Sequence, residues 1–423
     1  MKTKVGLSYL FLLFSFLALP LGSGFNIVTG FDFSKLFLFF VALSFLFLLI
    51  KKISTFNLQL NLLKYFYLLT IFIIFHSIIY YIINCPDEIL ISRYSNDSLI
   101  ANLVRLIMLS IFTFLIVENF SKRLIISSTI FLNIGYTISF LGGFFIKPFF
   151  DTKINAILAA DGRFYGGFDN PNTFAATSLS LFVLNLISLV NNENDSRLKF
   201  VNLIYIILSI VGIFMSQSRA ILVLLIIYIF LLATKFVLNK IKLKYVIISL
   251  LVILIIPFFI PKKSYDGLIN RIKTHSIKIN AKDENKLEES RVLIIGDYLR
   301  NINKYYLIGK GYNREISVIE NDYSTWRPFI PHNKYLSMLV QFGILGLLLF
   351  LIILLDIYFK FLNYKNTGSK TLYIIYFYFI IWILYFFVGQ QNNSRDYYLM
   401  FGMVFGILSL RNNLNNNEFK LIN

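Results

Sequence analysis

The chain has 423 residues, of which 57% are hydrophobic and 17% aromatic, and it carries a formal net charge of +18. Its apolar runs are long enough to cross the roughly 30 Å hydrocarbon core of a bilayer as helices, which excludes a soluble globular protein. The basic residues are scattered among the connections between these runs, so nucleic-acid binding is not predicted. The single cysteine, Cys85, excludes an internal disulfide and a cysteine-based metal site.

The apolar runs predict an all-α polytopic membrane protein with about twelve transmembrane helices. The predicted spans are residues 5–21, 36–50, 65–83, 99–117, 124–145, 173–190, 200–215, 220–234, 245–260, 333–359, 371–388 and 397–410. Lysine and arginine concentrate in every second connection, which places those connections and both chain termini in the cytoplasm. Alternatively, the first run is a secretory signal peptide, but its removal would break the alternation of charge.

The spans divide the chain into three parts. Residues 1–260 hold helices 1 to 9, residues 261–332 form a large external loop, and residues 333–423 hold helices 10 to 12 and a cytoplasmic tail. The large external loop therefore lies between helices 9 and 10.

An amphipathic helix is predicted within this loop. Apolar residues recur at helical spacing from Val292 to Tyr306, after the polar residues Glu288, Glu289 and Ser290. We expect this helix to lie along the outer surface or to cap the bundle, and the glycines of GKGYN, residues 309–313, to end it.

Two ionisable residues interrupt the first five spans. His76 is predicted to be a structural residue of the helix bundle. Arg105 lies about two turns inside the outer end of its span, where a charge faces protein or a water-filled cavity, or extends outward to lipid phosphate. Arg105 is therefore a candidate anion-binding residue.

A glycine-rich connection, DGRFYGGFDNPN, follows the fifth span at residues 161–172. Its glycines and proline predict tight turns with exposed backbone N–H groups, and Asn172 is a plausible N-cap of the next helix. Arg163 places a guanidinium beside those N–H groups, a combination that suits an anion. The alternative interpretation is an external turn that has no functional role.

Two further arginines belong to the same set of candidates. Arg219 ends the short turn SQSR, residues 216–219, at the outer mouth of the bundle. An arginine there also suits a simple interfacial anchor, but one anion shared by Arg105, Arg163 and Arg219 explains all three. Arg291 opens the predicted loop helix and faces either solvent or this site.

The last candidate is in PHNKYL, where the external loop meets the tenth span. Pro331 and Asn333 are typical of a helix start and place His332 at the helix N-terminus. The partial positive charge there disfavours imidazolium, so we expect His332 to be neutral at pH 7 and able to accept a proton. A polar interfacial residue is the alternative.

Four segments in this order resemble the O-antigen polymerase and O-antigen ligase family of bacterial envelope glycosyltransferases: GRFYGGFDNPN, SQSRA, SRVLIIGDYLRNINKYYLIGKGYN and PHNKYLSMLVQFGILGLLLF. The resemblance implies a C-type glycosyltransferase-like fold in the cytoplasmic (inner) membrane, with its active site facing the periplasm or exterior. It also implies that Arg163, Arg219 and His332 are functional, with Arg291 a weaker candidate. The chain lacks the paired Arg-Gly segments of some polymerases, which leaves polymerase and ligase open.

The substrate that the resemblance implies is an oligosaccharide on undecaprenyl diphosphate. Guanidinium groups neutralise a leaving diphosphate without a metal, and His332 is assigned as the general base that activates the acceptor hydroxyl, which predicts inversion. Asp32 is the alternative base. The outer connections show no Asp-x-Asp or His/Asp cluster, so we predict no metal and no other cofactor.

The predicted function is polymerisation of these lipid-linked repeat units into O-antigen or a related surface polysaccharide. The alternative is a ligase that transfers polymer to lipid A core, and a more distant one is a lipid-linked oligosaccharide flippase. Expected partners are the lipid-linked donor and acceptor, membrane lipid, and the chain-length regulator and flippase of the same pathway.

Overall fold

The computed structural model describes residues 6–22, 25, 33–52, 60–83, 99–153, 163–168, 170–192, 195–238, 291–312, 333–364, 369–388 and 395–412. All regular secondary structure in these ranges is helical, which confirms the predicted all-α fold. Seven of the described helices are long and apolar enough to cross a membrane. The protein is therefore a multi-pass membrane protein, while the total of twelve spans and the cytoplasmic termini stay predictions.

Every predicted span within the described residues coincides with a helix. These helices are α1 (Leu7–Ala18), α3 (Ser34–Lys52), α4 (Leu60–Ile83), α5 (Leu99–Glu118), α6 (Lys122–Lys153), α8 (Pro171–Asn191), α9 (Ser196–Ser216), α10 (Arg219–Leu238), α14 (Lys334–Tyr364), α15 (Lys370–Val388) and α16 (Arg395–Asn412). The remaining predicted span, residues 245–260, lies outside the described residues.

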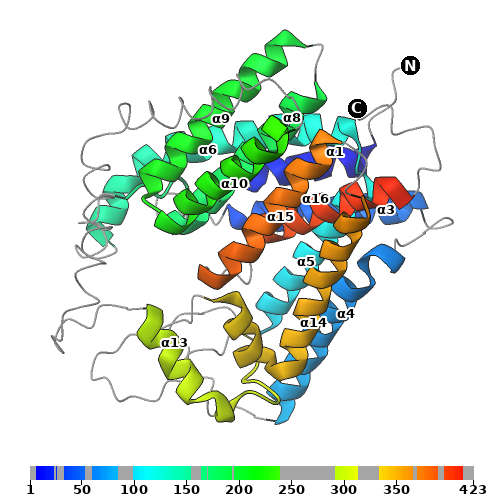
Figure 1. Ribbon diagram of the computed structural model, residues 1–423, viewed down its shortest axis with the longest axis vertical. Helices are drawn as coiled ribbons and strands as arrows, with labels where there is room; N and C mark the ends of the chain where they lie inside the picture. Colours follow the sequence, from blue (N-terminus) through cyan, green and yellow to red (C-terminus); the bar gives the residue numbers. More distant parts are fainter. Residues whose placement is uncertain are drawn as a thin grey trace.

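The helix α16 forms the centre of the bundle. Its residues 396–409 are all buried, and it packs against α4, α5, α8, α14 and α15. In Figure 1, α15 and α16 lie between one group formed by α6, α8, α9 and α10 and another formed by α4, α5 and α14. A helix buried on all sides explains why its sequence shows no polar face.

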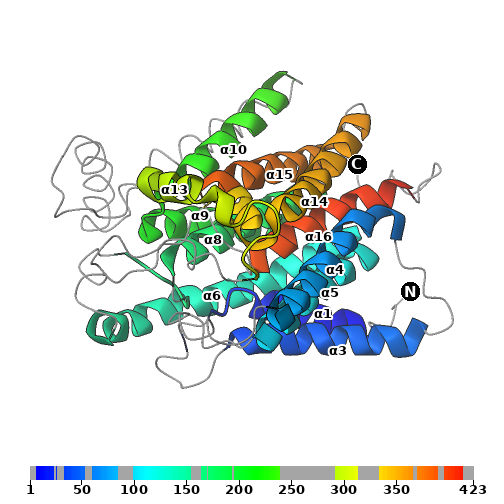
Figure 2. The same cartoon turned by 90° about the horizontal axis from the view of Figure 1, so that it is seen from below.

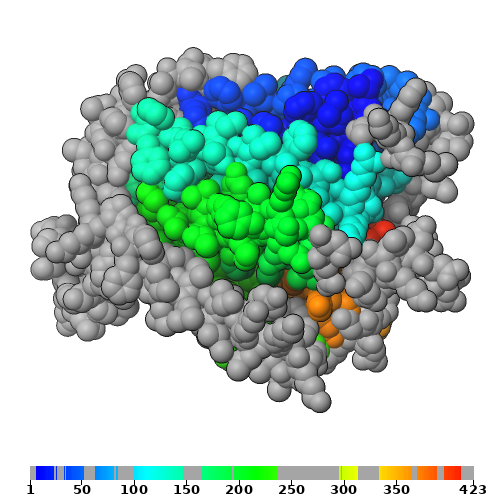
Figure 3. Space-filling view, turned by 90° about the horizontal axis from the view of Figure 1, so that it is seen from above, coloured from blue at the N-terminus to red at the C-terminus, as the bar shows by residue number. Residues whose placement is uncertain are grey.

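On the other side of the molecule the helices follow one another in layers. Figure 2 shows α1 and α3 together at one edge, and the space-filling view in Figure 3 shows the layer of α1 and α3, then α6, then the green helices α8 to α10. Neighbouring layers are in direct contact through α1 with α6 and α6 with α8. The sequential helices α1 and α3, and α8 and α9, are neighbours in space, as short connections favour, whereas α1 and α6 come from distant parts of the chain.

Polar side chains join α6 to α8 inside the bundle. Asn133 and Asn185 exchange two amide hydrogen bonds of 3.0 and 2.8 Å, and the hydroxyl oxygens of Tyr136 and Ser178 lie 2.8 Å apart. Lipid tails give helices no hydrophobic reason to associate, so such bonds and close packing hold them together.

The helix α14 is broken at Gly343, whose backbone angles are φ 65° and ψ −168°. In a straight helix, Lys334 and Phe350 would lie about 24 Å apart. Instead, Lys334 Nζ lies 5.9 Å from the centre of the Phe350 ring. The segment before Gly343 therefore folds back along the segment after it, as Figure 1 shows, which corrects the prediction of one continuous span over residues 333–359.

The break is held by the described loop residues 305–312, whose backbone pairs with that of α14. The N–H groups of Lys310 and Gly311 donate to the carbonyls of Val340 and Gln341 over 2.7 and 2.9 Å, and the N–H of Ile344 donates to the Tyr306 carbonyl over 2.7 Å. These bonds satisfy backbone groups that the broken helix leaves without partners, a requirement inside an apolar bundle.

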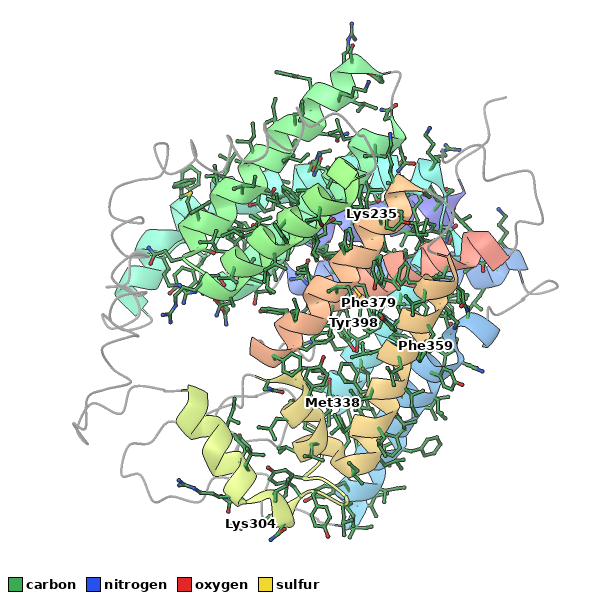
Figure 4. All side chains as sticks on the ribbon, viewed as in Figure 1. Lys235, Lys304, Met338, Phe359, Phe379 and Tyr398 are labelled. Atoms are coloured by element: carbon green, nitrogen blue, oxygen red, sulfur yellow. The ribbon has the colours of Figure 1, made fainter. Side chains whose placement is uncertain are left out.

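A loop helix lies where the spacing predicted one. α13 (Arg291–Arg300) is followed by the short 3-10 helix η4 (Ile302–Lys304), so the helix ends earlier than the apolar pattern suggested. Tyr298 and Tyr305 are buried against Leu336 and Val340 of α14. The loop thus caps the folded-back segment, and Figure 4 shows Lys304 at the extreme end of the molecule, beyond Met338.

Replacing Gly343 by alanine is expected to destabilise the protein. The new Cβ would lie 2.1 Å from the Leu307 carbonyl oxygen, and the backbone region is one that only glycine adopts without a cost of about 1–3 kcal/mol. We expect a lower thermal unfolding midpoint for the detergent-purified protein. Gly296→Ala is the control, because nothing lies within 4 Å of its added Cβ; equal midpoints for both variants would contradict the break at Gly343.

Candidate active site

The glycine-rich loop is fastened to the end of α9 by Arg163. Its Nε donates to the Ser216 carbonyl over 2.9 Å, and an Nη donates to Asn172 Oδ1 over 2.8 Å. The backbone N–H of Phe164 donates to the Met215 carbonyl over 3.0 Å. These bonds orient the guanidinium and bring it to the turn that precedes Arg219.

The start of α8 differs from the prediction for Asn172. The N-cap is Asn170, whose side chain accepts a hydrogen bond from the Asn172 N–H, and Pro171 is the first helical residue. Proline favours that first position because it has no N–H to leave unsatisfied. Asn172 lies inside the first turn, where its side-chain oxygen is used by Arg163 instead.

The turn between α9 and α10 depends on an unusual backbone angle. Gln217 has a φ of 53°, the left-handed region, and its N–H caps α9 by donating to the Phe214 carbonyl. The N–H of Ser218 donates to Ser216 Oγ over 3.2 Å. This tight turn makes Arg219 the first residue of α10, three positions after the carbonyl that Arg163 binds.

Of the other predicted site residues, the structure describes the side chain of Arg105 alone. Arg105 is half-buried on α5, which packs mainly against α16, α3 and α4. Arg291 begins α13, but its side chain lies outside the described part of the chain, as do the residues His332 and Asp32. The structure thus brings Arg163 to the Arg219 turn, and the proximity of the other candidates to that turn stays a prediction.

The helix start predicted after His332 is present. Asn333 precedes α14, and its side-chain oxygen accepts the N–H of Leu336 over 3.0 Å. The Asn333 amide also donates to the Phe387 carbonyl over 3.4 Å. The beginning of α14 therefore lies beside the end of α15.

His76 has structural surroundings. Its Nε2 lies 2.6 Å from the Ile308 carbonyl oxygen, and its ring packs on Phe72, Tyr80 and Phe342. The contact ties α4 to the loop beside the α14 break, which agrees with the structural role predicted for this residue.

The sequence patterns gave no indication of the role of Arg395. One Nη donates to the carbonyls of Ala18 and Leu21 over 2.9 and 3.0 Å, and the guanidinium lies 5.8 Å from the Phe168 ring centre. Arg395 therefore links the start of α16 to the end of α1 and to the glycine-rich loop.

Two other ionisable residues were also overlooked. Asp396 is buried, and its Oδ2 accepts a hydrogen bond from Thr177 of α8 over 2.7 Å. Lys334 is buried at the start of α14. The only available signal was a charge at the edge of an apolar run, which does not reveal the direction in which the side chain points.

Among the residues described, no group of three or more His, Cys, Asp or Glu is placed to hold a metal ion.

These features define a class: a multi-pass helical membrane protein with an arginine-bearing loop and turn on one side of the bundle and a folded-back helix capped by a loop. Residues 204–351 match the family model described as O-antigen ligase. This match covers the Arg219 turn and the start of α14, and it confirms the predicted resemblance to the O-antigen polymerase and ligase family. No curated protein matches the chain. The match supports a function of O-antigen ligase or polymerase type in polysaccharide assembly.

Replacing Arg395 by glutamine is expected to weaken the attachment of α16 to the end of α1. Arg395 is not a proposed substrate contact. The Ala18 and Leu21 carbonyls lose a charged donor, and such bonds contribute about 1.5–3 kcal/mol each. We expect a lower thermal unfolding midpoint in detergent, whereas Arg197→Gln, at an exposed position in the first turn of α9, leaves it unchanged. A similar midpoint for both variants would show that Arg395 does not hold α1 and α16 together.

Proposed function

We propose that the protein polymerises oligosaccharide repeat units carried on undecaprenyl diphosphate into O-antigen or a related surface polysaccharide, on the outer face of the cytoplasmic membrane. The observation that carries this proposal is the family match over residues 204–351, which supports a transfer of ligase or polymerase type. It includes Arg219, Arg291 and His332, whereas Arg163 and Arg105 precede the matched residues.

The arginines are proposed to stabilise the leaving diphosphate. Arg163 is already oriented by Ser216 and Asn172 beside the turn that carries Arg219. Two guanidinium groups suit the bidentate binding of phosphate oxygens, and their charge offsets the negative charge that develops as the glycosidic C–O bond breaks. Arg291 and Arg105 are proposed as further contacts to the same diphosphate.

His332 is proposed as the general base. It removes the proton from the acceptor hydroxyl while that oxygen attacks the anomeric carbon and lipid diphosphate departs from the opposite face, which inverts the configuration. Asn333 holds the adjoining helix start through its bond to the Leu336 N–H. Asp32 is the alternative base within the same reaction.

A ligase is the second candidate, because the matching family model is itself described as O-antigen ligase. The donor chemistry would be the same, and the acceptor would be lipid A core in place of another lipid-linked unit. A flippase would place basic residues deep in a central cavity between repeated halves, whereas Arg163, Arg219 and Arg291 lie on a loop, a turn and a helix start.

A deletion strain complemented with wild type or His332→Ala tests the proposal on a gel of surface polysaccharide. We expect the wild type to restore the ladder and the variant to leave core carrying one repeat unit. Loss of all capped core, with polymer still on undecaprenyl diphosphate, would instead identify a ligase. Full activity of His332→Ala together with loss in Asp32→Asn would move the base to Asp32.

Chelation is expected to leave transfer unchanged, because guanidinium groups supply the charge that a metal provides in many other glycosyltransferases. The measurement is the rate of chain extension by purified protein with EDTA, compared with the rate after Mg²⁺ or Mn²⁺ is restored. A loss of activity that the metal reverses would contradict the proposed arginine-based mechanism.

A further inference from the structure

Three neighbouring loop residues, Tyr306, Leu307 and Ile308, carry large side chains that the described part of the protein leaves exposed. Their exposed fractions are 42%, 60% and 68%. The residues on either side of them, Tyr305 and Gly309, are buried. Large apolar side chains that gather at the surface mark a contact with a partner or a membrane. We call residues 306–308 the apolar tip of the loop.

The apolar tip contacts α4 inside a candidate membrane span. The Ile308 carbonyl oxygen lies 2.6 Å from His76 Nε2, and His76 precedes the end of the span Leu62–Tyr80 by four residues. Ile308 is therefore level with a point about 6 Å inside that end of the span. The exposed surface of α4 stays apolar beyond this point, through Ile78, Ile79, Ile82 and Ile83.

The apolar tip also contacts α14 just after its break. The N–H of Ile344 donates to the Tyr306 carbonyl over 2.7 Å. From there an exposed apolar stripe follows the helix through Ile344, Leu345, Leu348, Ile352, Leu355 and Phe359. Both α4 and α14 contain candidate membrane spans, so their exposed apolar residues face acyl chains. The exposed side chains of the tip lie between these two lipid-facing stripes.

The backbone of the tip meets the requirement for a position in lipid. Irregular backbone is tolerated at membrane depth only where the protein itself satisfies its polar groups. The carbonyls of Tyr306 and Ile308 are paired with α14 and α4, as described above. In addition, the N–H groups of Tyr306 and Gly309 donate to the carbonyls of Ile302 and Tyr305, both over 2.9 Å. Polar groups of the tip are thus paired within the protein, while its apolar side chains face outward.

The residues that precede the tip suit the surface of a bilayer. Arg300 and Lys304 are exposed, and Figure 4 shows Lys304 at the extreme end of the molecule. Basic side chains extend toward lipid phosphate, and tyrosines such as Tyr306 favour the interface between acyl chains and headgroups. A leaflet is favoured over a protein partner because the apolar surface of the tip continues directly into the lipid-facing stripes.

We propose that the apolar tip is inserted among the acyl chains of the leaflet on the loop side, with Lys304 at the level of the phospholipid phosphates. The segment predicted to be an external loop thus has its own attachment to the membrane. This attachment fixes the end of the α13 and η4 segment at the bilayer surface. The inference does not depend on the proposed enzyme function.

Fluorescence quenching by lipid tests this proposal on the full chain in phosphatidylcholine vesicles. Single cysteines replace Leu307 or Ile308 in a Cys85→Ser background and carry an environment-sensitive fluorophore. A doxyl group deep in the acyl chains should quench both probes as strongly as a probe on Ile78→Cys, which faces outward from α4. Asn303→Cys, at an exposed polar residue of η4, is the matched control. Its doxyl quenching should be several-fold weaker and its quenching by aqueous iodide several-fold stronger.

The position of the basic residue is tested in the same vesicles. A probe on Lys304→Cys should be quenched more by a spin label on the lipid headgroup than by the deep doxyl group. The probe on Leu307→Cys should show the reverse order. The same order at both positions would contradict the proposed depths.

Two results for the Leu307 and Ile308 probes would overturn the inference. Iodide quenching equal to that of the Asn303 probe, without doxyl quenching, would place the tip in water. Shielding from both quenchers would mean that protein covers the tip, either a second copy or another segment of this chain. Size-exclusion chromatography before reconstitution confirms that each variant is folded, and the replaced side chains are exposed ones, so the paired backbone groups stay in place.

Discussion

The reversal of α14 at Gly343 is the constraint on which the half of the structure around α4, α13 and α14 depends. A helix that breaks in apolar surroundings exposes carbonyl and N–H groups that must find partners. The loop backbone from Tyr306 to Gly311 supplies them by pairing with Val340, Gln341 and Ile344. Loop and helix therefore form one unit, and the start of α14 is held within the bundle beside α15.

The first turn of α16 connects the two halves of the proposed site. Arg395 contacts the end of α1 and the ring of Phe168 in the glycine-rich loop, while Asp396 binds Thr177 of α8. The next residue, Tyr397, faces Lys334 at the start of α14. Three consecutive side chains thus link the glycine-rich loop to the folded-back segment of α14. A shift of α16 would therefore move this loop and this segment together.

The spans were predictable because an apolar run of sufficient length has few alternatives to a membrane helix. The break in α14 was not, since Gly343 lies in an apolar run and its angles depend on a loop that is distant in sequence. The glycine-rich surroundings made Arg163 a candidate, and its functional role stays a prediction; its partner Asn172 was assigned to the helix cap that Asn170 provides. Lys334, Arg395 and Asp396 were missed because sequence shows a charge without showing what it faces.

Intramolecular cross-linking tests the reversal of α14 most directly. In a Cys85→Ser background, Tyr335→Cys and Phe350→Cys replace two rings whose centres are 5.9 Å apart, whereas a straight helix would separate these positions by about 22 Å. A short bifunctional thiol reagent added to membranes should yield one cross-linked peptide by mass spectrometry. Modification of each thiol alone, with no cross-link, would mean that α14 is continuous and that the start of this helix lies elsewhere.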